Sequence, residues 1–235
     1  MRIALIGHGA IGRMVESQAK AAGDQIGAIL TARDSTSRII EDVAALLKGH
    51  DVAIDFSVGS AVATNVEACV RAGVPLVEGT TGWKNDETEV RRTVMEHGGA
   101  LVYGANFSIG VNVFYKLVTQ AAKLMAQLDQ YEAFIEEQHH SHKRDVPSGT
   151  ALKLKELMAE HIKVDIPIAS TRAGDIPGTH RVGFDSAADQ ITLTHTARSR
   201  AGFAAGALLA ARWIIGRKGV YEFRDIIDEM VKSDE

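Results

Sequence analysis

The sequence predicts an α/β protein that begins with a parallel sheet covered by helices on both faces and continues into an α+β unit with an open mixed sheet. In the first half, short apolar runs that fit buried strands alternate with helical stretches, an order typical of parallel sheets. After Asn106 the rhythm changes to one long helix followed by clustered strands. The composition, 46% hydrophobic and 24% charged in 235 residues, is ordinary for a globular protein of one or two domains.

The first unit consists of short apolar runs that end at turn residues. Residues 2–6 stop at Gly7, and an apolar run bounded by glycine is typical of a buried parallel strand. The other expected strands cover residues 25–30, 52–56, 75–78 and 100–103. Helices are expected between most of them, at residues 11–22, 39–48, 61–72 and 86–97.

The second unit has a different order of elements. We expect helices at residues 111–128 and 151–161, and strands at residues 131–138, 168–172, 180–185 and 190–198. An alanine-rich helix over residues 201–216 follows. Because no repeat or linker is visible, the domain boundaries rest on this rhythm alone. They give one domain of residues 1–106 with 201–235 and a second of residues 107–200.

Charge and apolar patterning exclude several classes of protein. The formal net charge is −4, so general attraction to nucleic acid or to an anionic membrane is not expected. No apolar run reaches the roughly 20 residues of a membrane span, and residues 1–6 lack the features of a secretory signal, so we expect a cytoplasmic protein. The one cysteine, Cys69, excludes an intrachain disulfide and fits a small buried side chain.

A glycine motif follows the first expected strand and opens the first expected helix. Six consecutive residues match the pattern G-x-G-x-x-G: Gly7, His8, Gly9, Ala10, Ile11 and Gly12. The first glycine permits a tight turn, the second lets the backbone approach a pyrophosphate, and the third lets the helix pack on the strand. The phosphates would meet free N–H groups at the positive end of the helix. We therefore expect a dinucleotide-binding domain of the Rossmann type, the alternative being a glycine-rich turn without a ligand.

The end of the second expected strand bears on the choice of cofactor. In many such domains an acidic residue binds the adenine-side ribose here, but this chain has Thr31, Ala32 and then Arg33. Arg33 and Thr31 could bind a 2′-phosphate that a carboxylate would repel, so NADPH is favoured over NADH. Asp34 keeps NADH open, and Arg33 could instead be a solvated surface residue.

Two further turns follow expected strands and belong to the same end of the sheet. One contains Gly79, Thr80 and Thr81, and the other contains Ala105, Asn106, Phe107 and Ser108. Ligands of open α/β sheets lie beyond the carboxyl ends of the strands, so both turns are expected to touch the nicotinamide half of the cofactor. Ordinary turn chemistry is the alternative, because these residue types favour turns anyway.

Proton donors gather in the segment of residues 136–150. Three of the nine histidines, His139, His140 and His142, stand beside Lys143, and a Pro-Ser-Gly-Thr turn and a helical stretch follow. Such a group beside a helix N-terminus suits an anionic substrate that must also be protonated. A solvated loop is one alternative. A metal site is not expected, because this histidine spacing does not share one helix face and no partner motif supports zinc.

The same segment resembles the signature of the dihydrodipicolinate reductase (4-hydroxy-tetrahydrodipicolinate reductase) family, E-x-x-H-H-x-x-K-x-D-x-P-S-G-T-A, over residues 136–151. Other segments, such as residues 52–57, 172–176 and 194–200, are similar as well. The resemblance implies an NAD(P)H-dependent reductase of a cyclic imine-type dicarboxylate in diaminopimelate and lysine synthesis. It also implies a homotetramer built through the sheet of the second domain.

The resemblance assigns roles residue by residue. His139 looks like the proton donor or acceptor and Lys143 like the second donor, while His140 looks like a ligand of a substrate carboxylate. The backbone N–H groups of Gly149 and Thr150, at the start of the helix expected over residues 151–161, fit the other carboxylate. Three further residues are less defined. Asp145 is expected to orient its neighbours, His142 to be structural, and Arg200 to reach the active site or to form a surface ion pair.

Two other functions fit the same architecture. One is another small NAD(P) dehydrogenase, similar to aspartate dehydrogenase, against which the pairing of His-His-x-x-Lys with Pro-Ser-Gly-Thr argues. The other is a nucleotide-sensing binding protein, which would leave the proton donors without a purpose. Oxidation of NADPH in the presence of the dihydrodipicolinate synthase product separates the three.

Overall fold

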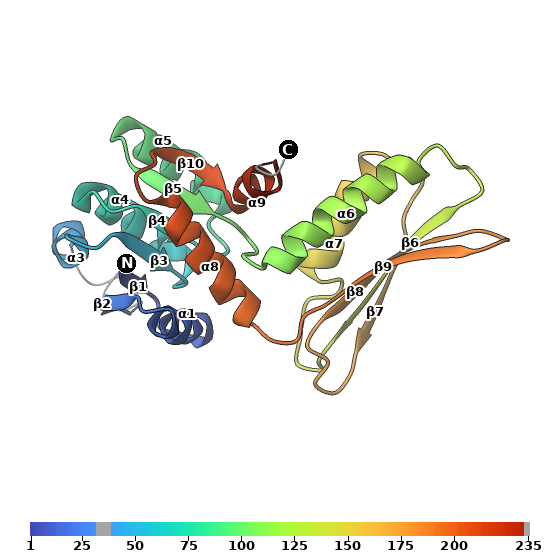
Figure 1. Cartoon of the computed structure of the whole chain (residues 1–235), viewed down its shortest axis with the longest axis horizontal. Helices are drawn as coiled ribbons and strands as arrows, with labels where there is room; N and C mark the ends of the chain where they lie inside the picture. Colours follow the sequence, from blue (N-terminus) through green and yellow to red (C-terminus); the bar gives the residue numbers. More distant parts are fainter. Residues whose placement is uncertain (32–38, 233–235) are drawn as a thin grey trace. The chain divides into compact units, whose positions relative to one another are not determined.

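The computed structural model describes residues 1–31 and 39–232, with no side-chain detail for residues 231 and 232. The chain forms two compact units, one of Met1–Ile109 with Arg200–Glu235 and one of Gly110–Ser199 (Figure 1). The chain thus passes between the units twice. The assignment of the first domain to the cofactor and the second to the substrate stays a prediction.

The first unit contains a six-stranded parallel sheet of order β10-β5-β4-β3-β1-β2. The strands are β1 (Arg2–Ile6), β2 (Gln25–Leu30), β3 (Val52–Asp55), β4 (Leu76–Glu78), β5 (Ala100–Tyr103) and β10 (Gly219–Glu222). Since β1 has β2 on one side and β3 on the other, the direction of winding reverses between β1 and β3. Open α/β sheets bind ligands at such a switch point, beyond the carboxyl ends of the strands.

Helices cover both faces of this sheet. They are α1 (Ala10–Ala21), α3 (Ile40–Leu47), α4 (Val62–Ala72), α5 (Glu87–Glu96), α8 (Ala201–Ile214) and α9 (Phe223–Lys232), with short 3₁₀ turns η1 (Gly59–Ala61) and η2 (Lys84–Asp86). Alternate residues of β1 enter different cores. Ile3 and Leu5 pack with α1, α8 and α9, whereas Ala4 and Ile6 pack with α3, α4 and α5. This two-sided burial explains why β1 is apolar at nearly every position.

The expected α/β class is confirmed. The ends of the expected strands and helices of the first unit lie within one residue of the observed ones, apart from the last helix, which is two residues shorter. Two elements were missed, β10 and α9. The four residues of β10 are half-buried and pair only with β5, so they carry too little apolar periodicity to stand out. α9 is nonetheless strongly amphipathic and places Ile226 and Ile227 in the core.

The second unit contains a mixed four-stranded sheet of order β7-β6-β8-β9, parallel between β6 and β7 and antiparallel elsewhere. The strands are β6 (Glu132–His139), β7 (Ile168–Arg172), β8 (Thr179–Asp185) and β9 (Gln190–Thr196), and the helices are α6 (Ile109–Met125) and α7 (Gly149–Ala159). Residues of α6 and α7, among them Phe114, Val118 and Leu154, form one core with β6 and β8. The expected open mixed sheet is thereby confirmed.

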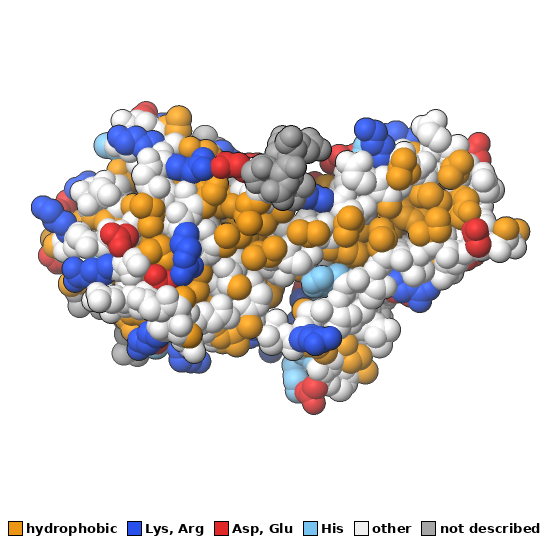
Figure 2. All heavy atoms as spheres, in the orientation of Figure 1, with side chains coloured by type: hydrophobic (Ala, Val, Ile, Leu, Met, Phe, Trp, Pro, Cys, Tyr) orange, Lys and Arg blue, Asp and Glu red, His pale blue; other side chains and the backbone are white. Residues whose placement is uncertain are grey.

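An apolar stripe on α6 lies at the surface of the second unit (Figure 2). Val113, Leu117 and Leu124 are 38%, 53% and 72% exposed, and their spacing places them on one helical face. Exposed apolar stripes of this kind are typical of contact surfaces. The expected homotetramer stays a prediction. Across the described ranges, no helix is both long and apolar enough to cross a membrane.

Close packing of α8 on the segment after β5 depends on one glycine. A Cβ atom on Gly206 would lie 1.7 Å from the backbone oxygen of Phe107, and neither group has room to move, because both residues are buried. Gly206→Ala should therefore lower the free energy of unfolding by about 1–3 kcal/mol, the usual effect of overpacking a core. Urea denaturation measures it. Gly202→Ala is the control, since this exposed glycine of the same helix has only Ser108 Oγ at 3.5 Å. An equal loss in both variants would contradict the packing argument.

Candidate active site

A cleft of about 440 Å³ opens at the switch point of the first unit. The loops that follow β1, β3 and β4 form it, together with the residue before α8; the lining residues are Gly9, Ala10, Ile11, Phe56, Ser57, Val58, Gly59, Gly79, Thr80, Thr81 and Arg200. In a parallel sheet these loops leave neighbouring strands at the same edge, so their convergence follows from the strand order.

Two of the three glycines of the motif, Gly7 and Gly12, take the structural roles expected of them in the turn. Gly7 has a φ of +85°, and a Cβ there would lie 2.4 Å from the oxygen of Phe56. A Cβ on Gly12 would lie 2.3 Å from the oxygen of Gly7, so the third glycine lets α1 pack on the turn. A Cβ on Gly9, by contrast, would meet no protein atom within 4 Å, although Gly9 lines the cleft. The space it leaves is open to a ligand.

Electrostatics at the cleft favour an anion. Gly9 is the N-cap of α1 and supplies no capping side chain, and the first turn of α1 has no acidic residue. Backbone N–H groups at this positive helix end are suited to a phosphate. Arg200 adds a cationic side chain to the cleft wall. These features fit the pyrophosphate of a dinucleotide, and they place Arg200, whose role the sequence left open, at the cleft.

Other expected cofactor residues lie away from the cleft lining. His8 is half-buried with its Nε2 2.7 Å from Glu16 Oε2. Phe107 is buried against Phe223, at 4.7 Å between ring centres, and Asn106 Oδ1 accepts a hydrogen bond from the N–H of Ser108 at 2.9 Å. Neither these residues nor the exposed Ala105 and Thr31 line the cleft, and Arg33 lies outside the described residues.

The sequence interpretation missed the loop after β3. Phe56, Ser57, Val58 and Gly59 line the cleft, and Phe56 also explains why residue 79 is glycine. A Cβ on Gly79 would lie 2.1 Å from the Phe56 ring. The rule that ligands meet the carboxyl ends of strands applies to β3 as well as to β4, so this loop could have been predicted.

A carboxylate organises the candidate site of the second unit. Glu137, on β6, is 1% exposed. Its Oε1 accepts hydrogen bonds from Ser148 N at 3.0 Å, Ser170 Oγ at 2.7 Å and Arg172 Nη2 at 2.7 Å. The neighbouring strand β7 supplies two of these donors, because it pairs with β6 and carries both Ser170 and Arg172. The buried charge is thereby compensated as buried carboxylates require.

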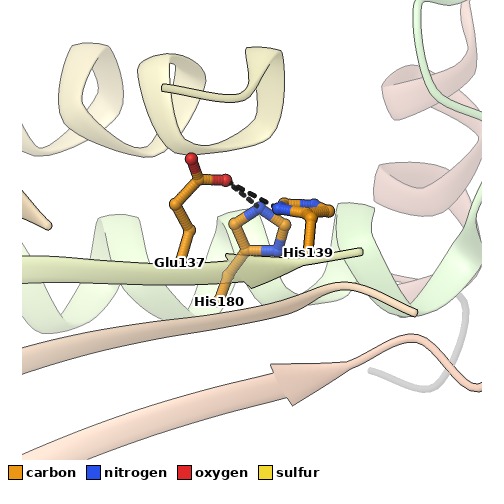
Figure 3. Close-up of side chains that lie close together, drawn as sticks. All are labelled: Glu137, His139 and His180. Carbon is orange, nitrogen blue, oxygen red and sulfur yellow. Dashed lines mark ion pairs between the residues drawn. The ribbon is translucent and has the colours of Figure 1, made fainter. Parts of the chain in front are cut away.

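Two histidines face the other oxygen of this carboxylate (Figure 3). His139 Nδ1 lies 2.9 Å and His180 Nε2 lies 3.8 Å from Glu137 Oε2. His139 ends β6 two residues after Glu137, so alternation directs both side chains to the same face. His180 reaches this face from the neighbouring strand β8, opposite Glu137. Gly178 completes the wall, since a Cβ there would lie 3.3 Å from His139 Nε2.

The protonation states follow from burial and from the donors around Glu137. Burial alone would raise the pKa of Glu137, but the hydrogen bonds from Ser148, Arg172 and Ser170 together lower it to about 2. Burial lowers the pKa of His139, which Glu137 partly opposes, and burial with the neighbouring His139 lowers the pKa of His180 to about 4. At neutral pH the cluster therefore consists of one carboxylate and two neutral imidazoles.

The helix beside the site begins earlier than expected. α7 starts at Gly149, and Ser148 is its N-cap, accepting a hydrogen bond from Ala151 N at 3.2 Å. The expected start at residue 151 was wrong because the capping role of Ser148 in the Ser-Gly-Thr turn was overlooked. Ser148 Oγ also lies 3.0 Å from His180 Nε2, so the cap connects the helix to the histidine cluster.

Asp145 contacts two groups that the sequence assigned to the substrate. Its Oδ1 lies 2.8 Å from Lys143 Nζ, and its carboxylate accepts a hydrogen bond from Gly149 N. A carboxylate thus already lies between the lysine and the helix N-terminus. The remaining expected residues lie nearby. His140 is half-buried, its ring 6.1 Å from that of the exposed His142, and Thr150 shares a side-chain hydrogen bond with Tyr115 of α6.

Sequence interpretation missed Glu137, His180 and Arg172 as members of this site. The donor atoms of Glu137, His139 and His180 lie within 4.8 Å of one another, an arrangement that could hold a metal ion. We assign none, because Glu137 Oε1 already has three donors and Oε2 faces His139 at 2.9 Å. The alternation of β6 predicts that Glu137 and His139 share a face, whereas only the pairing of β6 with β8 brings in His180.

The low pKa of Glu137 predicts a specific loss of stability in acid. A carboxylate with a pKa lowered to about 2 in the folded protein, against an ordinary value of 4.5, stabilises the fold above the ordinary value, and this stabilisation disappears as the pH falls towards the lower one. Between neutral pH and about pH 3, the free energy of unfolding of Glu137→Gln should therefore fall by on the order of 2 kcal/mol less than that of the wild type. Urea denaturation measures it, with Glu136→Gln as the control on the same strand. Identical acid dependence in wild type and Glu137→Gln would refute the assignment.

Comparison with known proteins accounts for both units. Residues 1–107 match the family model "Dihydrodipicolinate reductase, N-terminus", and residues 110–227 match "Dihydrodipicolinate reductase, C-terminus". A 4-hydroxy-tetrahydrodipicolinate reductase of Christiangramia forsetii is 37% identical over 99% of this chain and 100% of its own length, and one of Anaeromyxobacter dehalogenans is 35% identical over 92% and 87%. The fold is shared with dipicolinate-bound dihydrodipicolinate reductase from Paenisporosarcina sp. TG-14, at a TM-score of 0.81 and 21% identity over 96% of this chain and 99% of that one. The chain belongs to the dihydrodipicolinate reductase family.

Proposed function

We propose that this protein is a 4-hydroxy-tetrahydrodipicolinate reductase, which uses NAD(P)H to form tetrahydrodipicolinate in diaminopimelate and lysine biosynthesis. One observation carries the proposal beyond family membership. A neutral histidine, His139, is held against a buried carboxylate beside Lys143 and the N-terminus of α7. The histidine can take a proton from solvent and pass it to a substrate, while the lysine and the helix start can bind an anion, and the reduction of a dicarboxylate requires both.

The cleft of the first unit is the proposed cofactor site. The backbone N–H groups at the start of α1 and the guanidinium of Arg200 would hold the pyrophosphate, and Gly9 leaves the room for it. Thr80 and Thr81, on the loop after β4, would contact the remainder of the cofactor. When bound, the nicotinamide supplies the hydride. Phe107, in the segment of residues 105–108, packs against Phe223 in the core of this unit.

His139 is the proposed proton donor, and Glu137 sets the form in which it acts. A carboxylate can only accept, so Glu137 Oε2, at 2.9 Å, favours the imidazole tautomer with its proton on Nδ1. Nε2 is then the unprotonated nitrogen, so it must first take a proton from solvent, and the imidazolium formed beside Glu137 passes that proton to the substrate and becomes neutral again. The carboxylate would orient the ring through Nδ1, in the way that a carboxylate orients the histidine of a catalytic triad.

Lys143 and the start of α7 are the proposed substrate-carboxylate site. Asp145 lies between Lys143 Nζ and Gly149 N, and a carboxylate of the substrate would replace it there with the same charge and geometry. His140 and the N–H of Thr150 would add further donors. Lys143, once released from Asp145, becomes available as the second proton donor.

Substitution of the proton donor tests the proposal. His139→Gln should lower kcat for NADPH-dependent reduction of the freshly made dihydrodipicolinate synthase product by about 100-fold, the usual contribution of a general acid. NADPH affinity should stay within about twofold, because the residue is outside the cofactor cleft. NADPH absorbance measures turnover, and cofactor fluorescence measures binding. Lys143→Ala should behave similarly.

His142→Gln is the matched control, since this exposed histidine lies three positions from His139. Wild-type turnover in His139→Gln and Lys143→Ala would disprove the roles assigned to them. A wild-type protein that binds NADPH but does not oxidise it with this substrate would disprove the reaction itself.

We further propose NADPH as the preferred cofactor. Support comes from the end of β2, where Thr31 and Arg33 replace the acidic residue that would repel a 2′-phosphate. Arg33→Ala should lower kcat/KM for NADPH by about tenfold and leave that for NADH nearly unchanged, because only NADPH carries the phosphate. Steady-state kinetics with both cofactors measure this. An equal kcat/KM for NADPH in wild type and Arg33→Ala would show that Arg33 does not bind the 2′-phosphate.

A further inference from the structure

Two carboxyl groups are buried side by side beneath the cofactor cleft. Asp55 ends β3 and Glu78 ends β4, and the two residues are partners in the parallel register. Both are 0% exposed. They lie on the sheet face that packs against α4, since Ala53 and Leu76, two residues earlier on each strand, enter that core.

Each carboxyl group holds the cleft loop that follows its own strand. Asp55 Oδ1 accepts from Ser57 N at 2.7 Å, and Glu78 Oε1 accepts from Thr80 N at 2.6 Å. The loops are also joined directly, because Ser57 N reaches Thr80 Oγ1 at 3.1 Å. Ser57 and Thr80 both line the cleft. The two acids therefore determine where these cleft-lining groups stand.

The two groups cannot both be ionised at this depth. Asp55 and Glu78 are neighbours on adjacent strands and both are 0% exposed, so ionising both would leave two like charges side by side away from water. Glu78 Oε2 accepts no hydrogen bond from the described residues, as fits a protonated oxygen. Asp55 Oδ2 also accepts from Asn65 Nδ2 of α4 at 2.6 Å, so Asp55 is the better stabilised anion. Burial and the charge of Asp55 raise the pKa of Glu78 well above its ordinary value, which assigns the proton to Glu78.

Two other titratable side chains on this face, Cys69 and Tyr103, do not alter this assignment of the proton. Cys69 of α4 is buried, and burial with the two acids raises the pKa of its thiol, so it stays neutral. Tyr103, beside Glu78 on β5, has a raised pKa from burial and from Glu222. Its hydroxyl pairs with Arg91, Glu87 and Glu222.

We propose that Asp55 and Glu78 share one proton at neutral pH and act as positioning residues that hold the Ser57 and Thr80 loops in the geometry that binds the cofactor. The cofactor part of this inference rests on the proposed function. The shared proton does not, so the two parts can be tested separately.

Infrared spectroscopy of the protein without cofactor tests the shared proton. Wild type at slightly alkaline pH should show the C=O band of a protonated, buried carboxylic acid, shifted in D₂O. The band should be lost in Glu78→Gln and retained in Glu67→Gln, the control on a glutamate of α4 whose side chain is 37% exposed. Absence of the band in wild type, or its persistence in Glu78→Gln, would overturn the assignment of the proton to Glu78.

NADPH binding tests the positioning role. Glu78→Gln keeps an acceptor for Thr80 N and a donor for Asp55, so its Kd for NADPH should stay within about twofold of wild type. Glu78→Leu removes both the acceptor and the donor and should weaken NADPH binding by about tenfold. A cooperative thermal unfolding curve checks that this variant is folded. The KM for the dicarboxylate substrate should change by less than the KM for NADPH. Equal NADPH affinity in both variants would overturn the positioning role, whereas a wild type that binds no NADPH would overturn the proposed function instead.

Discussion

Parallel, in-register pairing of β1, β3 and β4 is the constraint on which the first unit depends. Because these strands run in one direction, their carboxyl ends emerge at one edge, and the loops that follow them must meet there. The glycine turn, Ser57 and Thr80 reach one cleft for this reason alone. The sheet needs helices on both faces to bury its apolar strands, and α1, which covers one of those faces, also points its N-terminus at the cleft.

In the second unit, a buried carboxylate brings the residues of the candidate site together. Its mixed sheet places Glu137 below the start of α7, and the carboxylate then gathers donors from β7 and from the helix cap. The three donors to Oε1, one of them a guanidinium, are what allow the charge to remain ionised when the residue is 1% exposed. That charge lies 2.9 Å from a nitrogen of His139, the proposed proton donor, and 3.8 Å from one of His180, which the cap residue Ser148 also contacts.

Buried carboxyl groups therefore serve both units, in opposite protonation states. Glu137 is surrounded by donors and keeps its charge, whereas Glu78 has one backbone donor and an anionic neighbour and takes up a proton. In each case the acid contacts backbone N–H groups of a loop or helix start that the proposed function uses. Side chains of this kind stabilise the fold and position the site together, so their substitution requires controls that separate the two effects.

The sequence by itself determined the fold class, nearly every strand and helix, the glycine turn and the segment with His139 and Lys143. These are local features, carried by periodicity and by residues adjacent in the chain. Tertiary structure alone decided that His180 and Arg172 join Glu137, that Asp55 meets Glu78, and that Arg200 rather than Phe107 lines the cleft. The physical reason is that strand order and register bring together residues from separate segments, and one sequence read alone does not specify either.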